Sequence, residues 1–269
     1  MIRGTNQLSE FHDLIRHSQS NSSRRTPEFF ALHVKSLSIT RDSSDPNLEE
    51  TLAVLQACSN VEWLVLWGFN RNGERTAKNN LHTFMTSSAI SPLRLSIMTA
   101  LFPEDQIHFL LPIFQNATHL ELVWFQMDSN TPKDDVKWNT LGLLKNLTHL
   151  SIYPGFSLGE GYSRLVGEIV SLCPESLRVF IIWVYNTSHY DERSPAYDDT
   201  RAISEGTVDM RTVSAYTGKH HPRMANYGFS RSLDEVLRDC AGIAVGEDMW
   251  TLAEDFIEAR RRRRSTLQS

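Results

Sequence analysis

The chain contains few cysteines and no long apolar segment. Only Cys58, Cys173 and Cys240 occur among 269 residues, and no two of them have the C-x-x-C spacing of a metal or redox motif. This pattern favours a reducing compartment over a disulfide-stabilised scaffold. No window approaches the roughly 18 apolar residues of a membrane span, and the first residues contain no run of signal-peptide length. We therefore expect a soluble protein of the cytoplasm and/or the nucleus, with no membrane partner.

An excess of positive charge is also absent. The formal net charge is -5. Sequence-independent binding to nucleic acid draws most of its affinity from neutralised phosphates, so this balance makes a nucleic-acid partner a poor expectation. Hydrophobic residues make up 41% and charged residues 22% of the chain, which excludes disordered, collagen-like and membrane classes for the whole. A chain of this length can bury roughly three quarters of the surface that its unfolded form exposes.

What the sequence does contain is a repeated strand pattern. Residues 146–152, NLTHLSI, show it: a hydrophobe, a Leu three residues later, and Leu or Ile two residues after that. The pattern recurs six times, at nearly constant intervals, which predicts six consecutive strands in one common register. Its fourth positions are Leu37, Leu64, Leu95, Leu120, Leu150 and Phe180, and its sixth positions are Ile39, Leu66, Ile97, Leu122, Ile152 and Ile182.

Segments with helical periodicity lie between these copies. The clearest is residues 160–173, in which Leu165, Ile169 and Leu172 share a face. Residues 190–209 are expected to form an exposed acidic loop, and the spacing of Met210, Val213 and Ala215 indicates a seventh strand. Residues 233–240 and 246–264 are expected to be helices. Further helices are expected to begin near Leu8, Thr26, Asp45, Pro103 and Trp138, and a weaker one near Leu81.

A strand and a returning helix cannot bury both of their apolar faces alone, but stacked units can. We therefore predict an α/β leucine-rich-repeat-like solenoid, with an open parallel sheet on the concave side and helices on the convex side. The pattern resembles the Leu-x-x-Leu-x-Leu core of that family, although the family's Asn is absent three residues after each sixth position. The expected single domain, 1–269, has a helical N-terminal cap (1–32), six degenerate repeats (33–189), an acidic irregular segment with a possible seventh strand (190–230), and C-terminal helices with an arginine tail (231–264).

The wider layout resembles the F-box and leucine-rich-repeat-like proteins of mushroom-forming fungi. The resemblance covers residues 26–264 and is carried by TPEFFALHVKSL (26–37), FQNATHLEL (114–122) and DMW (248–250) before an acidic-then-arginine helix. It implies substrate recognition in a cullin-RING ubiquitin ligase, with the F-box docking on a ligase adaptor. Residues 1–25 are too short for a three-helix F-box and lack its Leu-Pro start, so the adaptor contact rests on the family layout alone.

The third, fifth and seventh positions of each strand should point onto the concave face. Aromatic residues concentrate there, which is typical of binding hot spots. We predict a non-catalytic protein-interaction module, and the alternative that these aromatic residues pack under terminal segments stays open. The expected partner-binding residues are Trp63, Trp67, Arg94, His119, Glu121, His149, Tyr153 and Trp183.

Two of these positions raise the question of a metal. His119 and His149 occupy the same position of neighbouring strands, with Glu121 beside them, so a site of two histidines and one carboxylate is geometrically conceivable. The repeated Thr-His-Leu sequence explains both histidines without a metal. We expect no metal and no cofactor.

An alternative function is a serine hydrolase. Residues 155–159, GFSLG, match the G-x-S-x-G nucleophile elbow around Ser157, between an expected strand and an expected helix. Asp198 and His220 or His221 follow in the Ser, Asp, His order. Pro154 separates strand from elbow, no oxyanion segment of the HGGG type is visible, and the motif falls where a strand-to-helix loop is expected. We therefore do not expect an enzyme.

The five arginines 260–264 form the last motif. They can serve as a nuclear-import or phosphate-binding patch. The plainer interpretation is a solvated helix end whose positive charge complements the helix dipole.

Overall fold

The computed structural model describes residues 2–18, 28–40, 48–68, 75–87, 89–102, 107–124, 136–154, 161–185, 195–217 and 227–268. It has one large sheet with helices on both sides, so the expected α/β class is confirmed. Neighbouring strands of this sheet all run parallel, in the order β1-β2-β3-β4-β6-β8-β9-β10-β11. The strands are β1 (Ile2–Arg3), β2 (Ser36–Thr40), β3 (Trp63–Trp67), β4 (Arg94–Met98), β6 (His119–Trp124), β8 (His149–Pro154), β9 (Val179–Tyr185), β10 (Thr212–Thr217) and β11 (Gly228–Ser230).

The common register of the six predicted strands is confirmed. Leu37 lies opposite Leu64, and the pairing continues through Leu95, Leu120 and Leu150 to Phe180. Because side chains alternate along a strand, this register gathers the fourth and sixth positions on one face, called here the outer face. The third, fifth and seventh positions lie on the opposite face, the inner face.

The seventh strand, β10, is present, but its register differs from the prediction by one residue. Thr212, not Val213, pairs with Phe180, and Val213 pairs with Ile181. A shift of one residue moves every side chain to the other face. Val213 and Ala215 therefore lie on the inner face, while the large ring of Tyr216 fills space on the outer face.

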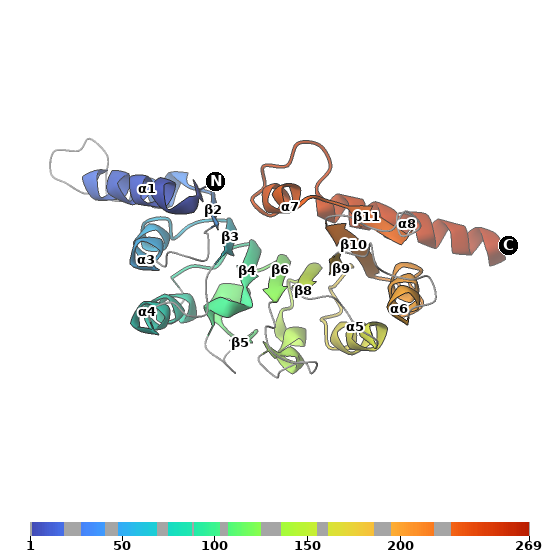
Figure 1. The fold of residues 1–269 in the computed structure, drawn as a ribbon. Helices are drawn as coiled ribbons and strands as arrows, with labels where there is room; N and C mark the ends of the chain where they lie inside the picture. Colours follow the sequence, from blue (N-terminus) through green and yellow to red (C-terminus); the bar gives the residue numbers. More distant parts are fainter. Residues whose placement is uncertain are drawn as a thin grey trace.

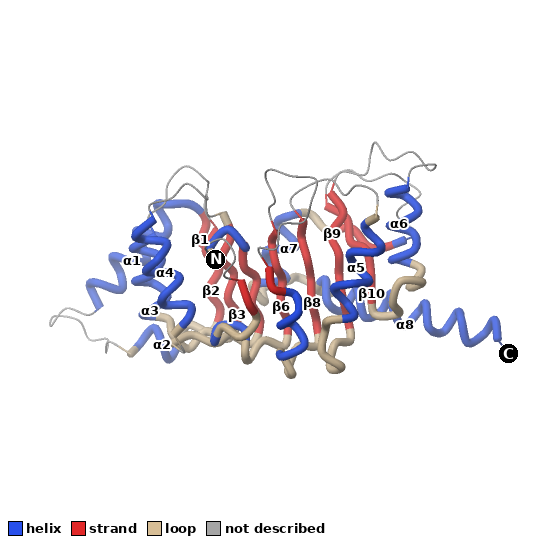
Figure 2. The backbone as a smooth tube through the Cα atoms, turned by 90° about the horizontal axis from the view of Figure 1, so that it is seen from below, coloured by secondary structure: helices blue, strands red, loops and turns tan. Residues whose placement is uncertain are grey.

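Helices cover both faces of the sheet. In Figure 1 the strands follow an arc, with α3 to α6 on its outer side and α7 and α8 on its inner side. Figure 2 gives the second view of the sheet and its helices. The helices are α1 (Gly4–Ser18), α2 (Phe29–His33), α3 (Leu48–Ala57), α4 (Arg75–Thr86), α5 (Tyr162–Ser171), α6 (Pro195–Ser204), α7 (Leu233–Cys240) and α8 (Met249–Gln268). Among the described residues, no helix has both the length and the apolarity that crossing a membrane requires.

Several expected helices are confirmed and others are not. The helices α1 to α5 lie where helices were expected, and α7 has the predicted bounds. The predicted apolar face of α5 is only partly correct, because Ile169 is buried beside Val166 and Val170, whereas Leu172 lies after the helix and is 38% exposed. In the region expected to form a helix from Pro103, the described residues 107–114 hold β5 (Ile107–His108) and the short 3-10 helix η2 (Pro112–Phe114). Pro112 has no backbone N–H, so a helix cannot continue regularly through it, and it begins η2 instead. The remaining short elements are η1 (Thr99–Leu101), η3 (Trp138–Leu143), and β7 (Val136–Lys137), which pairs with β5.

The segment expected to be an acidic loop contains the helix α6. Its buried residues Tyr197 and Ile203 join the outer core, which the acidic composition of the segment conceals. Asp199 on α6 accepts hydrogen bonds from the backbone N–H groups of Gly161 and Tyr162, at 2.9 and 2.8 Å. The carboxylate thereby caps the positive end of α5. The prediction of an exposed loop is wrong for residues 195–204.

Candidate functional site

The inner face, expected to be an open binding surface, is covered by α7 and α8. Trp183 is fully buried, and Trp67 and Tyr153 are only 7% and 8% exposed. They pack in a second hydrophobic core with Val236 and other residues of α7 and α8. The expectation of an exposed aromatic band is therefore wrong for this conformation, and the alternative that terminal segments cover these rings is confirmed. We call Trp67, Tyr153 and Trp183 the aromatic band.

A symmetric chain of hydrogen bonds crosses this buried face. The indole of Trp67 donates to the Ser96 hydroxyl at 2.6 Å, which donates to Glu121 Oε2 at 2.6 Å. On the other side, the indole of Trp183 donates to the Ser151 hydroxyl at 2.8 Å, which donates to Glu121 Oε1 at 3.3 Å. Indole N–H groups only donate, so the two serines relay donors inward to one carboxyl group. These five residues are called the Glu121 network.

Helix α7 closes the Glu121 network from above. The thiol of Cys240 donates to Glu121 Oε2 at 2.7 Å. Glu121 is fully buried, and burial raises its pKa to about 7, against the opposing effect of the bonds from Cys240, Ser96 and Ser151. Burial, with the nearby Glu121 carboxyl, also raises the pKa of the Cys240 thiol well above its usual value. Glu121 was expected to bind a partner, but in this structure it joins strand β6 to helix α7 of the same chain.

The third strand positions form a second row at the edge of the inner face. Trp63, Arg94, His119 and His149 pair in register on four successive strands, and we call them the rim row. The guanidinium carbon of Arg94 lies 4.0 Å from the ring centroid of Trp63, and its Nη1 lies 3.2 Å from Asp248 Oδ2. Trp63 and Arg94 remain partly exposed. The sequence thus brings together four of the eight expected binding residues in one row.

The two histidines of the rim row are stacked under α8. Their rings lie 4.1 Å apart with an interplanar angle of 3°, and Trp250 meets both edge-on. Burial lowers the pKa of His119 to about 3, and the charges of His149 and Arg94 add to this effect. Burial also lowers the pKa of His149, although Glu254 opposes it with an oxygen 3.3 Å from Nε2. Both rings are therefore neutral near pH 7.

The described part of the chain contains no group of three or more His, Cys, Asp or Glu side chains placed to hold a metal ion. The carboxyl oxygens of Glu121 are engaged by Ser96, Ser151 and Cys240 rather than by the histidines. The conceivable site of His119, His149 and Glu121 is therefore not assembled in this conformation.

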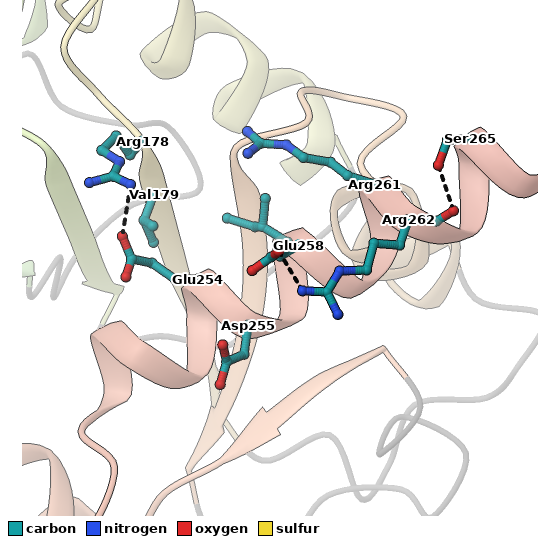
Figure 3. A pocket seen from close by; sticks show the side chains of 9 residues that line it. Arg178, Val179, Glu254, Asp255, Glu258, Arg261, Arg262 and Ser265 are labelled. Carbon is teal, nitrogen blue, oxygen red and sulfur yellow. Dashed lines mark hydrogen bonds and ion pairs between the residues drawn. The ribbon is translucent and has the colours of Figure 1, made fainter.

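Two grooves flank the rim row. The first, of about 440 Å³, lies beside Trp63 and is lined by Asp239, Glu247 and Asp248 among others. The second, of about 640 Å³, runs along α8 and includes Arg178 from the edge of the sheet. Figure 3 shows Arg178 directed towards Glu254, and Glu258 directed towards Arg262 on the next turn. Acidic and basic side chains alternate in the second groove, so it has no preference for a ligand of one charge.

Most residues of the alternative hydrolase site lie outside the described ranges. These are Ser157, His220 and His221, so the elbow stays a prediction. Asp198, the expected acid, lies on α6 with 61% of its side chain exposed and pairs with Arg201 at 3.0 Å.

The arginine run divides into two parts. Arg260 is buried and donates to the carbonyl oxygens of Ser204, Met210 and Thr212, so the expectation of a solvated helix end is wrong for this residue. Residues 261–264 are exposed on the part of α8 that extends away from the sheet in Figure 1.

Several residues of the site were missed by sequence reasoning. Four of them belong to α7, α8 or the connection between them, and each contacts a strand residue far earlier in the chain: Cys240 contacts Glu121, Asp248 contacts Arg94, Trp250 contacts His119, and Glu254 contacts His149. One signal was present: the inner-face positions include Val65, Val123, Val179 and Ile181, which is more apolar than an open surface favours.

Comparison with known proteins gives no relative. No family model, no curated protein and no solved structure matches this chain.

Proposed function

We propose that this chain is a leucine-rich-repeat-like solenoid that acts as a non-catalytic protein-interaction module, with its partner on the inner face. The observation that carries the proposal is the rim row. Strands held in one register present side chains of the same strand position, and Trp63 and Arg94 stay partly exposed beside the 440 Å³ groove. Tryptophan and arginine are the residue types that most often dominate binding between proteins.

The sequence resemblance supports a narrower role. As in the F-box and leucine-rich-repeat-like proteins of mushroom-forming fungi, the chain would select a substrate for a ubiquitin ligase in the cytoplasm and/or the nucleus. Recognition by a rim of variable side chains on a uniform strand scaffold suits such selection, because rim residues can change without loss of the outer core. The buried rows of Leu and Ile on the outer face provide such a uniform scaffold.

The proposal is tested by affinity purification from an extract of a mushroom-forming fungus. The native chain is compared with the variant Trp63→Ala/Arg94→Ala, and with the control Arg164→Ala, whose side chain is 84% exposed on α5. We expect proteins, including subunits of a cullin-RING ligase, that the native chain and the control retain and the rim variant loses. Each candidate is then purified and its dissociation constant is measured for the three chains.

Identical protein sets for the native chain and the rim variant would contradict binding at the rim. Absence of ligase subunits, with a rim-dependent partner still present, would leave the interaction module and remove the ligase role. Labelling of the native chain by a fluorophosphonate probe at Ser157 would favour the hydrolase instead.

A further inference from the structure

Helix α7 occupies the inner face as a bound helix of a partner would. It presents Val236, Leu237 and Cys240 to the second core, and its last turn is followed by the buried Ala241. The hydroxyl of Ser36 donates to the carbonyl oxygen of Ala241 at 2.5 Å. Helix-in-groove recognition uses the same arrangement, with apolar anchors about one turn apart on one helix face.

We propose that α7 is a removable cover, that ionisation of Glu121 releases it, and that an amphipathic helix of the protein partner then takes its place over the aromatic band. This inference rests on the proposed function for the identity of the occupant. The release itself concerns only this chain and is tested separately.

The release follows from what surrounds Glu121. From α7 the Cys240 thiol and the Asp239 carboxyl face it, and from β4 and β8 only the hydroxyls of Ser96 and Ser151 do. No cation of the described residues forms an ion pair with this fully buried carboxyl. An ionised carboxylate without a cationic partner is costly in a dry site, and a displaced α7 would let water solvate it.

The same surroundings explain why Glu121 is tolerated below neutral pH. While the carboxyl is protonated it carries no charge, and burial raises its pKa to about 7. The hydroxyls of Ser96 and Ser151 stay with the sheet and already point at its oxygens, so they are placed to receive the anion together with water after α7 departs. The charge of Asp239 on the same helix raises the pKa of Glu121 further, while its own contacts with Arg231 Nε at 3.3 Å and with the Met249 N–H at 2.9 Å must be released when α7 departs.

Helix α7 is easier to displace than α8. It has eight residues, and the connection to α8 bends at Gly242 and Gly246, where φ is +70° and +91°. Between these glycines the side chain of Val245 is 90% exposed, so this part of the connection adds no buried apolar contact that would hold α7. By contrast, α8 is fixed independently by Trp250 over the stacked histidines and by the buried Arg260.

Departure of α7 would uncover a specific surface. The rings of Trp67 and Tyr153 lie 6.5 Å apart and those of Tyr153 and Trp183 lie 6.2 Å apart, so the aromatic band is continuous. The occupant follows from this surface and from the charge that releases α7: aliphatic side chains at positions i and i+1, where α7 has Val236 and Leu237, and a lysine or arginine at i+4, in place of Cys240, that pairs with the ionised Glu121.

The test measures how well α7 protects Cys240 from a thiol reagent. The full chain is treated with 4,4′-dithiodipyridine between pH 5 and 8, and the labelling rate of each cysteine is read by mass spectrometry relative to a model thiol peptide at the same pH. We expect the protection of Cys240 to fall by up to about tenfold per pH unit and to level off above pH 7, as linkage to a single proton requires. In Glu121→Gln the protection should be constant above about pH 6, where Asp239, whose pKa burial raises to about 6, is already ionised.

The chain contains its own control. Cys58 is buried in the outer core, away from α7, so its protection should stay constant over the same range. A loss of protection at Cys58 in parallel with Cys240 would mean global unfolding and would overturn the proposal. Constant protection of Cys240 in the native chain would overturn it as well, whether or not Glu121→Gln folds. Cys240 opening without any captured partner would uphold the cover and count only against the proposed function.

Discussion

Tryptophan serves two different purposes at two positions of the same sheet. Trp183 is fully buried, donates its indole N–H to Ser151, and packs between Tyr153 and Phe229 at ring distances of 6.2 and 6.1 Å. Trp63 is partly exposed, and its ring carries the guanidinium of Arg94. The first residue therefore acts on stability and the second on the surface that a partner can reach.

Replacement of each tryptophan by alanine should separate these purposes. Trp183→Ala removes a large buried ring and should lower the free energy of unfolding by roughly 3–5 kcal/mol. Trp63→Ala leaves most of the core intact and should cost about 1 kcal/mol. Urea unfolding followed by circular dichroism measures both values. Equal losses for the two variants would show that the burial of Trp183 does not determine its contribution.

The C-terminal helix packs on the inner face through Trp250, Ala253 and Ile257, and Arg260 attaches its next turns to the end of the sheet. Arg260 reaches the carbonyl oxygens of Ser204 and Met210, both at 2.6 Å, and of Thr212 at 3.0 Å, joining α8 to the end of α6 and the start of β10. Gly206 has φ +66°, and a Cβ atom there would meet the guanidinium, so glycine makes room for this contact. Within the run of five arginines, Arg260 is thus the one whose side chain is buried against the fold.

Changes within the arginine run should therefore have unequal effects. Arg260→Ala leaves buried carbonyl groups without a donor and should lower the free energy of unfolding by about 3 kcal/mol. Arg260→Lys should recover only part of this, because an ammonium group lacks the planar fork of donors. Arg263→Ala, on the exposed part of the helix, should change stability by less than about 0.5 kcal/mol. Thermal and urea unfolding compare the three. An equal loss in Arg263→Ala would contradict the special position of Arg260.

At the scale of the whole molecule, the outer face could be predicted from sequence and the inner face only in part. Leu and Ile recur at fixed positions of short segments, so Leu150 and its equivalents reveal their strand, face and register locally. The cover by α7 and α8 depends on contacts such as Cys240 with Glu121, which are 119 residues apart. No local pattern encodes a contact of that separation.

Long-range packing also explains the error in the register of β10. The spacing of Val213 and Ala215 fits the outer-face pattern, but small side chains are also what the inner face needs under α8, and Tyr216 takes the outer side. The choice between the two registers is made by packing on both faces at once. The rim row was correctly placed, because it needs only the strand register, whereas its partners Asp248 and Trp250 were missed.

The pH dependence of stability should combine opposing contributions from the two rows of the inner face. Glu121 has a raised pKa, so its stabilising contribution is full below about pH 4.5 and is lost as the pH rises to about 7. Asp239, with a pKa raised to about 6, acts in the same direction. His119 and His149 have lowered pKa values, so their contribution is full above pH 6.5 and is lost as the pH falls. The two carboxyl groups and the two histidines therefore oppose one another, so we expect the stability of the native chain to change less with pH than either pair alone would cause.

Glu121→Gln should break this balance. Without the titrating carboxyl, only Asp239 opposes the two histidines, so the free energy of unfolding of the variant should rise with pH relative to that of the native chain between about pH 4.5 and 7. Relative to the native chain, the variant should gain up to roughly 3 kcal/mol between pH 4.5 and 7, the equivalent of the raised pKa. Urea unfolding at half-unit pH steps, followed by tryptophan fluorescence, measures both curves. If the two stability curves run parallel, the difference between them does not depend on pH, and Glu121 does not titrate in this range.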